Sequence, residues 1–410
     1  MAPKSNSLLT PALSSLRQAQ GRLGKRGRIL RIGIDCRTML NPIGGERAGV
    51  GHYTFHIVKA LLEIDQDNEY FLYFDHLMPN AVVDDFSQAN VTVRRLPFSR
   101  YRKFLPFAYS HLLLAAYLSR DQLDVFHAPA NVMPLSYNRP TVVTIHDLAI
   151  YEHPEWFPSQ VASTRLLVPQ TVKKAAAIIA VSKATKKDLL DLFNLTSKKV
   201  HVILEAADTA TLNLRDRTVD VRKYYKLPKK FIFYVGTIDP RKSLPTLIQA
   251  WQRLSRLRPK AVQDTALVIA GGAGYRGQDV LELIAELKDP SVRYLGYLSH
   301  NHKIRLMKEA SAFVFPTRYE GFGLPVLEAM QLGTPVISTN ISSIPEVTGS
   351  AALLVKPDDV DGFTQALLSI LTKPVLAKRL SQDGKKQAKL FSWTKAAKET
   401  LAVYQQVAQE

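Results

Sequence analysis

The chain has 410 residues, of which 46% are hydrophobic and 22% are charged, a composition typical of a globular protein with two or three domains. The single cysteine, Cys36, excludes internal disulfides and zinc sites built from cysteines, and it agrees with a reducing cytosol. The net charge is +18, and residues 1–31 contribute +7 of it because they contain no acidic residue.

Residues 1–28 are expected to form a basic, disordered tail, because they combine low hydrophobicity with positive charge. The tail has no continuous apolar stretch after Lys4, so it makes a poor secretory signal. Elsewhere no run of about 18 apolar residues predicts a transmembrane helix. The charge of the tail suits an anionic membrane surface or a nucleic acid, and a plain unordered extension is an equal alternative.

Apolar runs alternate with helical patterns along the chain, which favours open parallel α/β sheets. The first series of expected strands is Ile29–Cys36, Tyr70–Tyr73, Val91–Arg94, Val125–His127, Val142–Ile145, Ile178–Val181 and Val200–Ile203. The second series is Phe231–Val235, Ala266–Ala270, Arg293–Leu295, Ala312–Phe315, Pro335–Ser338 and Ala352–Val355.

A polar segment, Asp208–Lys230, separates the two series and contains seven Lys or Arg residues. It indicates the boundary between two Rossmann-like domains, which we expect to span residues 29–225 and 226–393. A last helix is expected over 394–410. Two such domains that face each other form a deep cleft at the carboxyl ends of both sheets.

The connection after the first strand is rich in glycine. Residues 41–51 have the sequence NPIGGERAGVG, and a helix is expected over His52–Glu63. Glycine allows backbone amides to approach a phosphate closely at such a helix start, with Gly49 and Gly51 nearest to it. The segment lacks the GxGxxG fingerprint, so a flexible turn stays open as the alternative.

Cations and aromatic rings alternate in the segment Phe98–Phe107, which has the sequence FSRYRKFLPF. This pattern suits shallow insertion into an anionic membrane surface. It also suits single-stranded nucleic acid, whose bases stack on aromatic rings. The structural alternative is a core helix with a basic rim.

The expected strand Val142–Ile145 ends at His146 and Asp147, where the carboxyl edge of the first sheet faces the cleft. A neutral histidine at this place can hydrogen-bond the hydroxyl groups of a ligand. The alternative is a capping pair at a junction between a strand and a loop.

Two adjacent cations, Arg241 and Lys242, follow the expected strand Phe231–Val235. At the carboxyl end of a strand they suit a diphosphate that gains negative charge as it leaves, because electrostatic stabilisation is a large catalytic effect. An exposed basic turn is the alternative.

The segment Phe313–Glu328 is the most informative motif of the chain. Two glutamates eight positions apart, Glu320 and Glu328, flank a turn that contains glycine, Gly321–Pro325. Proline suits the start of a helix, so the amides of Phe322, Gly323 and Leu324 are expected at a helix N-terminus, where partial positive charge attracts phosphate. Carboxylates beside an anion site suit the hydroxyls of a sugar and a ribose.

This spacing of the glutamates resembles the signature of retaining glycosyltransferases of family four, which have the GT-B fold. Residues 336–355 resemble the same family, and the resemblance extends from about Arg31 to the C-terminus. The sequences TIDPRKS and TIHDL resemble a group 1 subgroup rich in mannosyl and rhamnosyl transferases. The resemblance implies an α/β fold of two Rossmann-like domains across a cleft, with the last helix crossing back to the first domain.

The resemblance also implies roles for the motif residues. Catalytic roles fall on His146, Asp147 and Glu320, with Glu320 on the sugar hydroxyls. Donor binding falls on two further groups. The ribose and diphosphate contacts are Glu328, Phe322, Gly323, Leu324, Arg241, Lys242, Gly49 and Gly51. The base is expected near Tyr297 and Leu298, and Thr237 stands where many relatives have an arginine, a role that Arg241 can supply.

The implied reaction is a metal-independent, retaining transfer of a hexose, with mannose favoured, and no cofactor or metal is expected. The expected donor is GDP-mannose, with a UDP-sugar as the alternative. The expected acceptor is a saccharide or a lipid-linked saccharide of cell-surface polysaccharide or glycolipid synthesis. This places the protein in the cytoplasm, at the inner face of the membrane if it binds there.

Two other functions compete with this one. A sugar-nucleotide epimerase has the same architecture but needs no acceptor. A nucleic-acid-binding protein is suggested by the charge of +18 alone. It leaves both glutamates of the motif unexplained, and no nucleic-acid motif accompanies the charge, so no nucleic-acid partner is expected.

Overall fold

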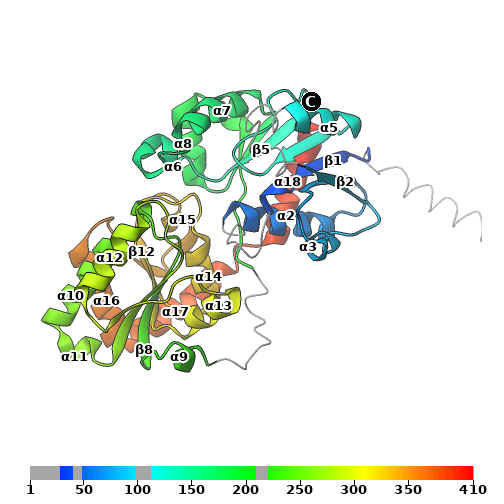
Figure 1. Ribbon diagram of the computed structural model, residues 1–410. Coiled ribbons are helices and arrows are strands. Elements are labelled where there is room, and N and C mark those ends of the chain that lie inside the picture. The colour runs from blue at the N-terminus through cyan, green and yellow to red at the C-terminus, as the bar shows by residue number, and fades with distance from the viewer. Residues whose placement is uncertain (1–27, 40–48, 98–111, 209–219, 410) are drawn as a thin grey trace, which may run out of the picture.

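The computed structural model describes residues 28–39, 49–97, 112–208 and 220–409 (Figure 1). The basic tail up to residue 27, the first part of the glycine-rich connection and the segment Phe98–Phe107 lie outside these residues. Within the described residues no helix is long and apolar enough to cross a membrane.

Two parallel sheets form the framework of the protein, and every strand expected from the sequence is present in them. The first sheet has the order β3-β2-β1-β4-β5-β6-β7 and the second the order β10-β9-β8-β11-β12-β13. The strands of the first sheet are β1 (Arg31–Asp35), β2 (Glu69–Asp75), β3 (Val91–Leu96), β4 (Val125–Ala128), β5 (Thr141–Ile145), β6 (Ala177–Ala180) and β7 (Val200–Val202). Those of the second are β8 (Lys230–Val235), β9 (Thr265–Ala270), β10 (Val292–Tyr294), β11 (Ala312–Phe315), β12 (Val336–Thr339) and β13 (Ala352–Val355).

Helices cover both faces of the first sheet, and the side chains of β2 show how. Successive residues of a strand point to opposite faces. Tyr70, Leu72 and Phe74 therefore enter the core under α2 (Val50–Ile64), whereas Phe71 and Tyr73 enter the core on the other face. The helices described in this domain are α2, α3 (Asn80–Asp84), α5 (Leu114–Arg120), α6 (Ala149–Glu152), α7 (Val161–Lys174) and α8 (Lys183–Phe193).

The second sheet is covered in the same way. In Figure 1 the helices α10, α12 and α16 lie on one side of it, and α13, α14 and α17 lie on the other. The helices are α9 (Val221–Tyr224), α10 (Leu244–Leu257), α11 (Pro259–Val262), α12 (Gly277–Leu287), α13 (His300–Glu309), α14 (Leu324–Leu332), α15 (Ile344–Thr348), α16 (Val360–Thr372) and α17 (Pro374–Ala388). Val221 is buried in this core, so the second domain begins to pack before residue 226, where the sequence suggested its start.

The last helix, α18 (Trp393–Val407), follows the second domain in the chain but packs on the first, as expected (Figure 1). Trp393, Tyr404 and Val407 are buried with side chains of β1, β2 and α2. The hydroxyl of Tyr404 lies 2.6 Å from Nδ1 of His127 in β4. Burial lowers the pKa of His127 to about 3, so this histidine is a neutral anchor for the helix.

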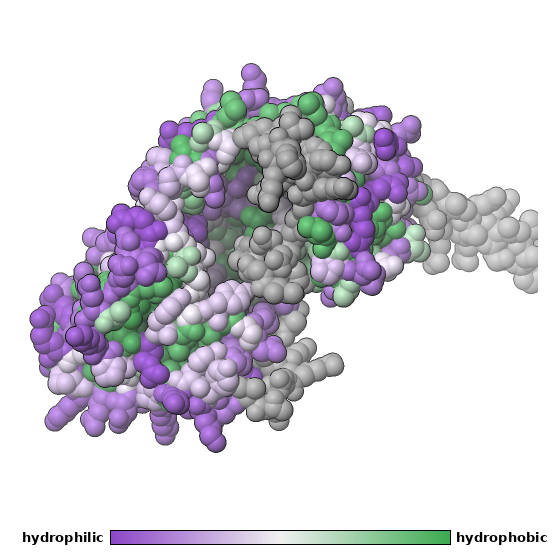
Figure 2. All heavy atoms as spheres, viewed as in Figure 1, coloured by the Kyte–Doolittle hydropathy of each residue, from purple (hydrophilic) through white to green (hydrophobic). Residues whose placement is uncertain are grey.

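The order of both sheets reverses at one position, between β1 and β4 in the first sheet and between β8 and β11 in the second. Loops at such a switch point diverge and leave a crevice at the carboxyl ends of the strands. Figure 2 shows that the surface is hollowed between the two domains. The expected parallel α/β architecture of the GT-B kind is confirmed. The loops after β8 and β11 at the second switch point are therefore the expected ligand-binding segments.

Candidate functional site

Glu320 lies in the loop after β11, five residues beyond Phe315, and its side chain is buried. Its carboxylate accepts a hydrogen bond from the ammonium of Lys242 and another from Oγ1 of Thr317 at 2.8 Å. Burial alone raises the pKa of a carboxyl group. Lys242 and Arg241 outweigh burial, so the pKa of Glu320 is lowered. Glu320 is therefore an anion inside the protein.

Glu328 lies on α14 and is also buried. Its two carboxylate oxygens accept hydrogen bonds from Nζ of Lys303 at 2.9 and 2.8 Å. Lys303 comes from the polar helix α13, and nothing in the sequence around it suggested a role. The pair places a cation between the second glutamate and the solvent.

The turn between the two glutamates has a backbone conformation that requires glycine. Gly323 has φ of +100°, and α14 starts directly after it, with Pro325 in its first turn and Gly333 at its end. The hydroxyl of Ser343 stabilises this turn, because it donates a hydrogen bond to the carbonyl of Phe322 at 2.8 Å. Among the described residues, the amides of Phe322, Gly323 and Leu324 have no acceptor. The N–H groups of these three residues at the N-terminus of α14 are therefore available to a phosphate.

Arg241 and Lys242 stand in a single 3-10 turn, η6 (Pro240–Lys242), after β8. Lys242 is buried against Glu320, and burial together with Arg241 lowers the pKa of its ammonium. The guanidinium of Arg241 lies 3.5 Å from Asp147 of the first domain, and its buried Nε has no partner among the described residues. Thr237 is exposed. Arg241 therefore occupies the crevice with one donor still available.

His146 follows β5 and is held by three groups of the first domain. Its amide donates to Oδ1 of Asn131 at 2.8 Å. Its Nδ1 lies 3.1 Å from a carboxylate oxygen of Glu205, and its Nε2 lies 2.8 Å from the carbonyl of Pro129. Because both partners are acceptors, both ring nitrogens must carry protons.

Burial lowers the pKa of His146, but the hydrogen bond and charge of Glu205 outweigh burial, and the net shift is upward. The environment of His146 therefore favours the protonated, positively charged imidazolium, whereas the sequence suggested a neutral histidine. Glu205 was not identified from the sequence, because it lies in an irregular segment after β7 and far from His146 in the chain. A carboxyl group close to a cleft histidine can be found only from the fold.

The loop after β11 touches the loop after β5 across the cleft. A β-carbon placed on Gly321 would lie 1.8 Å from the carbonyl oxygen of His146. The hydroxyl of Tyr319 contacts the carboxylate of Asp188 at 2.5 Å and accepts from the amide of Leu148 at 3.4 Å. His146 and Asp147 are therefore brought next to the loop that carries Glu320.

Gly49 and Gly51 belong to the start of α2 on the same side of the cleft. Gly49 has φ of +63°, and its carbonyl accepts the first hydrogen bond of the helix from Tyr53 at 3.0 Å. The ring of Tyr53 meets that of His146 edge to face, with the centroids 4.9 Å apart. The end of the glycine-rich connection therefore lies next to the histidine, as a phosphate-covering loop would.

Tyr297 and Leu298 follow β10 at the outer edge of the second sheet. The side chain of Tyr297 is 67% exposed, whereas Leu298 is buried in the core. The carbonyl of Gly296 accepts from the amide of Gly271, which fixes this loop to the end of β9 at 2.9 Å. Among the described residues, no hydrogen bond or ion pair joins this pair to the glutamates, so their role in base binding stays a prediction.

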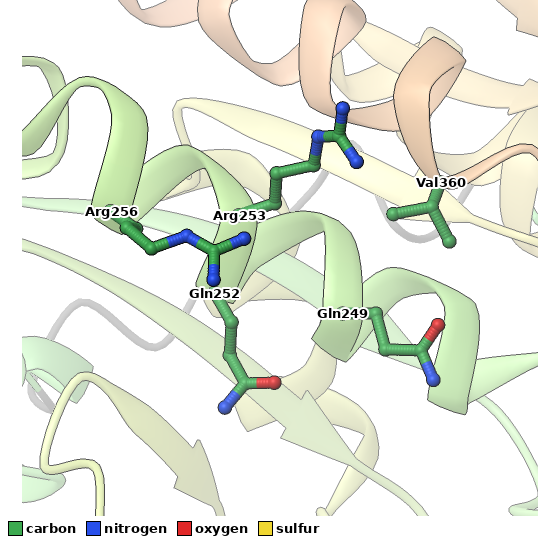
Figure 3. Close-up of a pocket in the computed structure, with 5 residues that line it drawn as sticks. All are labelled: Gln249, Gln252, Arg253, Arg256 and Val360. Carbon is green, nitrogen blue, oxygen red and sulfur yellow. The ribbon is translucent and has the colours of Figure 1, made fainter.

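A separate shallow pocket lies on the outside of the second domain (Figure 3). It has a volume of about 480 Å³ and is lined by side chains of α10 together with the first residue of α16, namely Gln249, Gln252, Arg253, Arg256 and Val360. None of these residues belongs to the loops at the switch point. We therefore place the candidate site in the cleft and not in this pocket.

Comparisons with known proteins find matches over most of the chain. The family model described as Glycosyltransferase Family 4 matches residues 47–211, and the model described as Glycosyl transferases group 1 matches residues 216–387. O-antigen chain mannosyltransferase B of Escherichia coli is 30% identical over 88% of this chain and 97% of its own length. O-antigen chain mannosyltransferase RfbU of Salmonella typhimurium is 27% identical over 82% of this chain and 90% of its own.

Solved structures share the fold at low identity. Sucrose-phosphate synthase from Thermosynechococcus elongatus superposes with a TM-score of 0.71 at 21% identity, over 92% of this chain and 99% of that one. The Anabaena protein HepE, in complex with UDP and glucose, gives a TM-score of 0.68 at 17% identity, over 92% of this chain and 100% of that one. These likenesses concern the fold.

Proposed function

Since the chain belongs to the group 1 glycosyltransferases and is a hexosyltransferase, we propose that it transfers mannose from a nucleotide sugar to a saccharide acceptor. The observation that carries the proposal is the crevice at the second switch point. There the two glutamates Glu320 and Glu328, the cations Arg241 and Lys242, and three amides without acceptors among the described residues lie on the segments that follow β8 and β11. This donor set matches the hydroxyls and the diphosphate of a nucleotide sugar.

The donor would bind mainly to the second domain. The amides of Phe322, Gly323 and Leu324 would hold the diphosphate, with Arg241 beside them. Glu328 would bind the ribose hydroxyls. In the free protein its carboxylate is instead paired with the ammonium of Lys303. The fold neighbour HepE, solved with UDP and glucose, supports a nucleotide sugar as the donor class.

In the transfer step the bond between the anomeric carbon and the diphosphate oxygen breaks, and a bond forms between that carbon and the acceptor hydroxyl. The proton of the hydroxyl passes to the departing phosphate. Arg241 and Lys242 would stabilise the negative charge that develops on the leaving group. Glu320 is already bonded to Lys242 and Thr317, which supports a role in holding the sugar and not in attacking it.

His146 would act through its charge. Both of its ring nitrogens are engaged by Glu205 and Pro129, so the imidazolium is well suited to electrostatic stabilisation beside the sugar and diphosphate. Asp147 would position Arg241, from which it is separated by 3.5 Å.

Mannose as the sugar rests on the relatives, because two similar chains are named O-antigen chain mannosyltransferases. GDP-mannose is the favoured donor and a UDP-sugar the alternative. A lipid-linked saccharide would be reached at the cytoplasmic face of a membrane, and the net charge of +18 supports contact with anionic lipid there. Sedimentation with anionic and neutral vesicles tests this part separately.

The test of the donor is calorimetry and thermal shift with GDP-mannose, UDP-glucose, UDP-N-acetylglucosamine and dTDP-rhamnose, with Glu328→Ala as the control. Binding of one donor that is lost in the variant would support the proposal, and no response to any nucleotide would contradict it. Product analysis distinguishes the epimerase, which would release free sugar from the donor without an acceptor. Oligonucleotide binding that is tighter than donor binding would instead revive the nucleic-acid function.

A further inference from the structure

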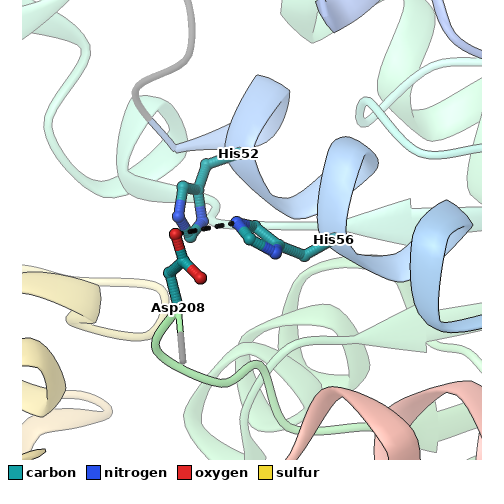
Figure 4. Close-up of side chains that lie close together, drawn as sticks. All are labelled: His52, His56 and Asp208. Atoms are coloured by element: carbon teal, nitrogen blue, oxygen red, sulfur yellow. Dashed lines mark ion pairs between the residues drawn. The ribbon is translucent and has the colours of Figure 1, made fainter. Parts of the chain in front are cut away.

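Three potential metal ligands from distant parts of the chain meet beside the crossover between the domains (Figure 4). His52 and His56 are four residues apart on α2, so they lie on one face of the helix. Asp208 comes from the segment after β7, where the chain leaves the first domain. In Figure 4 the carboxylate of Asp208 points toward both imidazole rings.

The distances suit one ion bound between the three side chains. One ligand atom of each residue lies within 4.8 Å of the others, and Nε2 of His56 is 3.9 Å from Oδ2 of Asp208. Two ligands that bind one zinc ion tetrahedrally at about 2.1 Å lie about 3.4 Å apart. The three atoms therefore need to approach one another by only about 1 Å to reach coordination distance.

The surroundings of the cluster favour an ordered site. Trp393, at the start of α18, stacks on His56 with ring centroids 5.3 Å apart and planes at 15°. The same indole lies 6.3 Å from the ring of His52. All three ligand residues are half-buried, which leaves room for water or another ligand in the remaining coordination positions.

We propose that His52, His56 and Asp208 bind one divalent transition-metal ion, zinc being the best match. Two imidazoles and one carboxylate suit zinc and its neighbours in the first transition row better than they suit magnesium or calcium, which prefer oxygen ligands. The ion joins α2, whose first turn carries Gly51, to the segment that links the two domains. Its ligands differ from the donor-site residues after β8 and β11, and His52 directly follows Gly51, which is expected near the donor phosphates.

The alternative is a simple ion pair between His56 and Asp208, with His52 as a neighbour. The chain provides a matched control for it. His153 pairs with Glu155 at 3.1 Å and stacks on Trp156, with ring centroids 3.9 Å apart and planes at 15°. That arrangement has one histidine, one carboxylate and one indole but no second histidine. It therefore matches the proposed site in these three groups and lacks only the third metal ligand.

The experiment uses full-length protein without an affinity tag, freed of metal by a chelator and then dialysed. Zinc binding is measured by calorimetry, and cobalt binding by visible absorption and by quenching of tryptophan fluorescence. We expect one ion per chain and a higher unfolding temperature with zinc. His52→Gln and Asp208→Asn should each weaken binding at least about 10-fold, whereas His153→Gln should leave it unchanged.

Equal affinity in His52→Gln, Asp208→Asn and the wild type would overturn the proposal, because the ion would then bind elsewhere. Absence of stoichiometric binding to the wild type would overturn it as well and would leave only the ion pair. Circular dichroism of each variant in chelator shows whether it is folded. The two substitutions lie on different elements, so the test holds if one of them impairs folding. No donor is present, so the result is independent of the sugar-transfer proposal.

Discussion

At the scale of single residues, the site is built from charges that are buried in pairs. Glu320 lies against Lys242, Glu328 against Lys303, and His146 against Glu205. A buried charge is tolerated only with a partner, so each pair is expected to be more costly to break than to replace as a whole.

Lys242→Met removes the ammonium but keeps most of the side-chain volume. The carboxylate of Glu320 would then be buried without its cation, which costs about 3–5 kcal/mol of stability. Urea unfolding should show this loss, and the double variant with Glu320→Gln should recover most of it. Neither protein should transfer sugar. If the single and double variants were equally stable, the pair would have no such role.

Glu205→Gln should lower the pKa of His146, because burial, which opposes the charge, would remain without the carboxylate. A titration of the His146 ring protons by NMR measures this directly. In the wild type the midpoint should lie above the ordinary value of about 6.5, and in the variant below it. Glu155→Gln, beside His153, is the control and should leave the His146 titration unchanged.

The same pair has a consequence for stability. A histidine whose pKa is higher in the folded state adds stability that is complete below the unfolded pKa and is lost as pH rises through the folded pKa. The free energy of unfolding should therefore fall as pH rises above about 6.5, and this part of the slope should disappear in Glu205→Gln. A slope that stays the same in the variant would show that other groups cause it.

Gly321→Ala places a β-carbon 1.8 Å from the carbonyl oxygen of His146, a distance that forces the loop after β11 away from the first domain. A displacement of about 1 Å at a catalytic group can reduce turnover about 100-fold. We expect a loss of that size in transfer activity, measured with saturating donor. Gly272→Ala, where no atom lies within 4 Å of the new carbon, is the control and should retain activity.

At the scale of elements, α14 and α18 have different tasks. The first presents its N-terminus to the crevice, with Gly323 allowing the turn that frees the amides. The second packs beside α2 on the core of the first domain, and the contact between Tyr404 and His127 fixes its position there. One helix is therefore mainly functional and the other mainly structural.

Tyr404→Phe removes the hydroxyl that satisfies Nδ1 of the buried His127. An unsatisfied buried polar group costs about 1–3 kcal/mol, and the variant should be less stable by that amount in urea. Tyr294→Phe removes a hydroxyl that donates to the carbonyl of Gly271 at the partly exposed edge of the second sheet, and its effect should be smaller. Equal losses in both variants would argue against the anchoring role.

At the scale of the whole molecule, several contacts hold the two domains together around the cleft. The carboxylate of Glu346 in the second domain accepts from the amide of Lys183 at the start of α8 in the first, at 2.8 Å. Tyr319 makes a similar bridge to Asp188 and Leu148. Because these contacts join the two domains, they affect how far the cleft opens.

Glu346→Ala should shift the free protein toward a more open arrangement, because α8 loses a cap that the other domain supplies. Small-angle X-ray scattering should give a larger radius of gyration for the variant without donor, and saturating donor should reduce the difference. Glu282→Ala on the exposed face of α12 is the control. An unchanged radius would mean that the remaining contacts suffice for closure.

Much of the fold could be predicted from the sequence, because buried parallel strands are continuous apolar runs that are easy to recognise. Ala312–Phe315 and Ala352–Val355 were predicted to the residue. The two glutamates and the cations after β8 were also singled out by their sequence pattern, and their roles stay predictions. The boundary between the domains stays a prediction, since Val221 is one apolar residue in a polar segment and only the core shows where it packs.

Lys303, Glu205 and Asp188 were missed for a common reason. Each is a single charged residue on a helix or an irregular segment, where charged residues usually face solvent. Their partners are distant in the chain, so no local pattern distinguishes them from surface charges. The same holds for Asp208, whose proximity to His52 and His56 depends on the path of the chain after β7.

The position of α18 has a consequence for how the protein is made. Domains usually fold in order as the ribosome delivers them, the N-terminal one first. Here Trp393, Tyr404 and Val407 complete the core beneath β1, β2 and α2, and they are synthesised after the entire second domain. The first domain therefore cannot complete its core until residues 393–407 are available to pack on it.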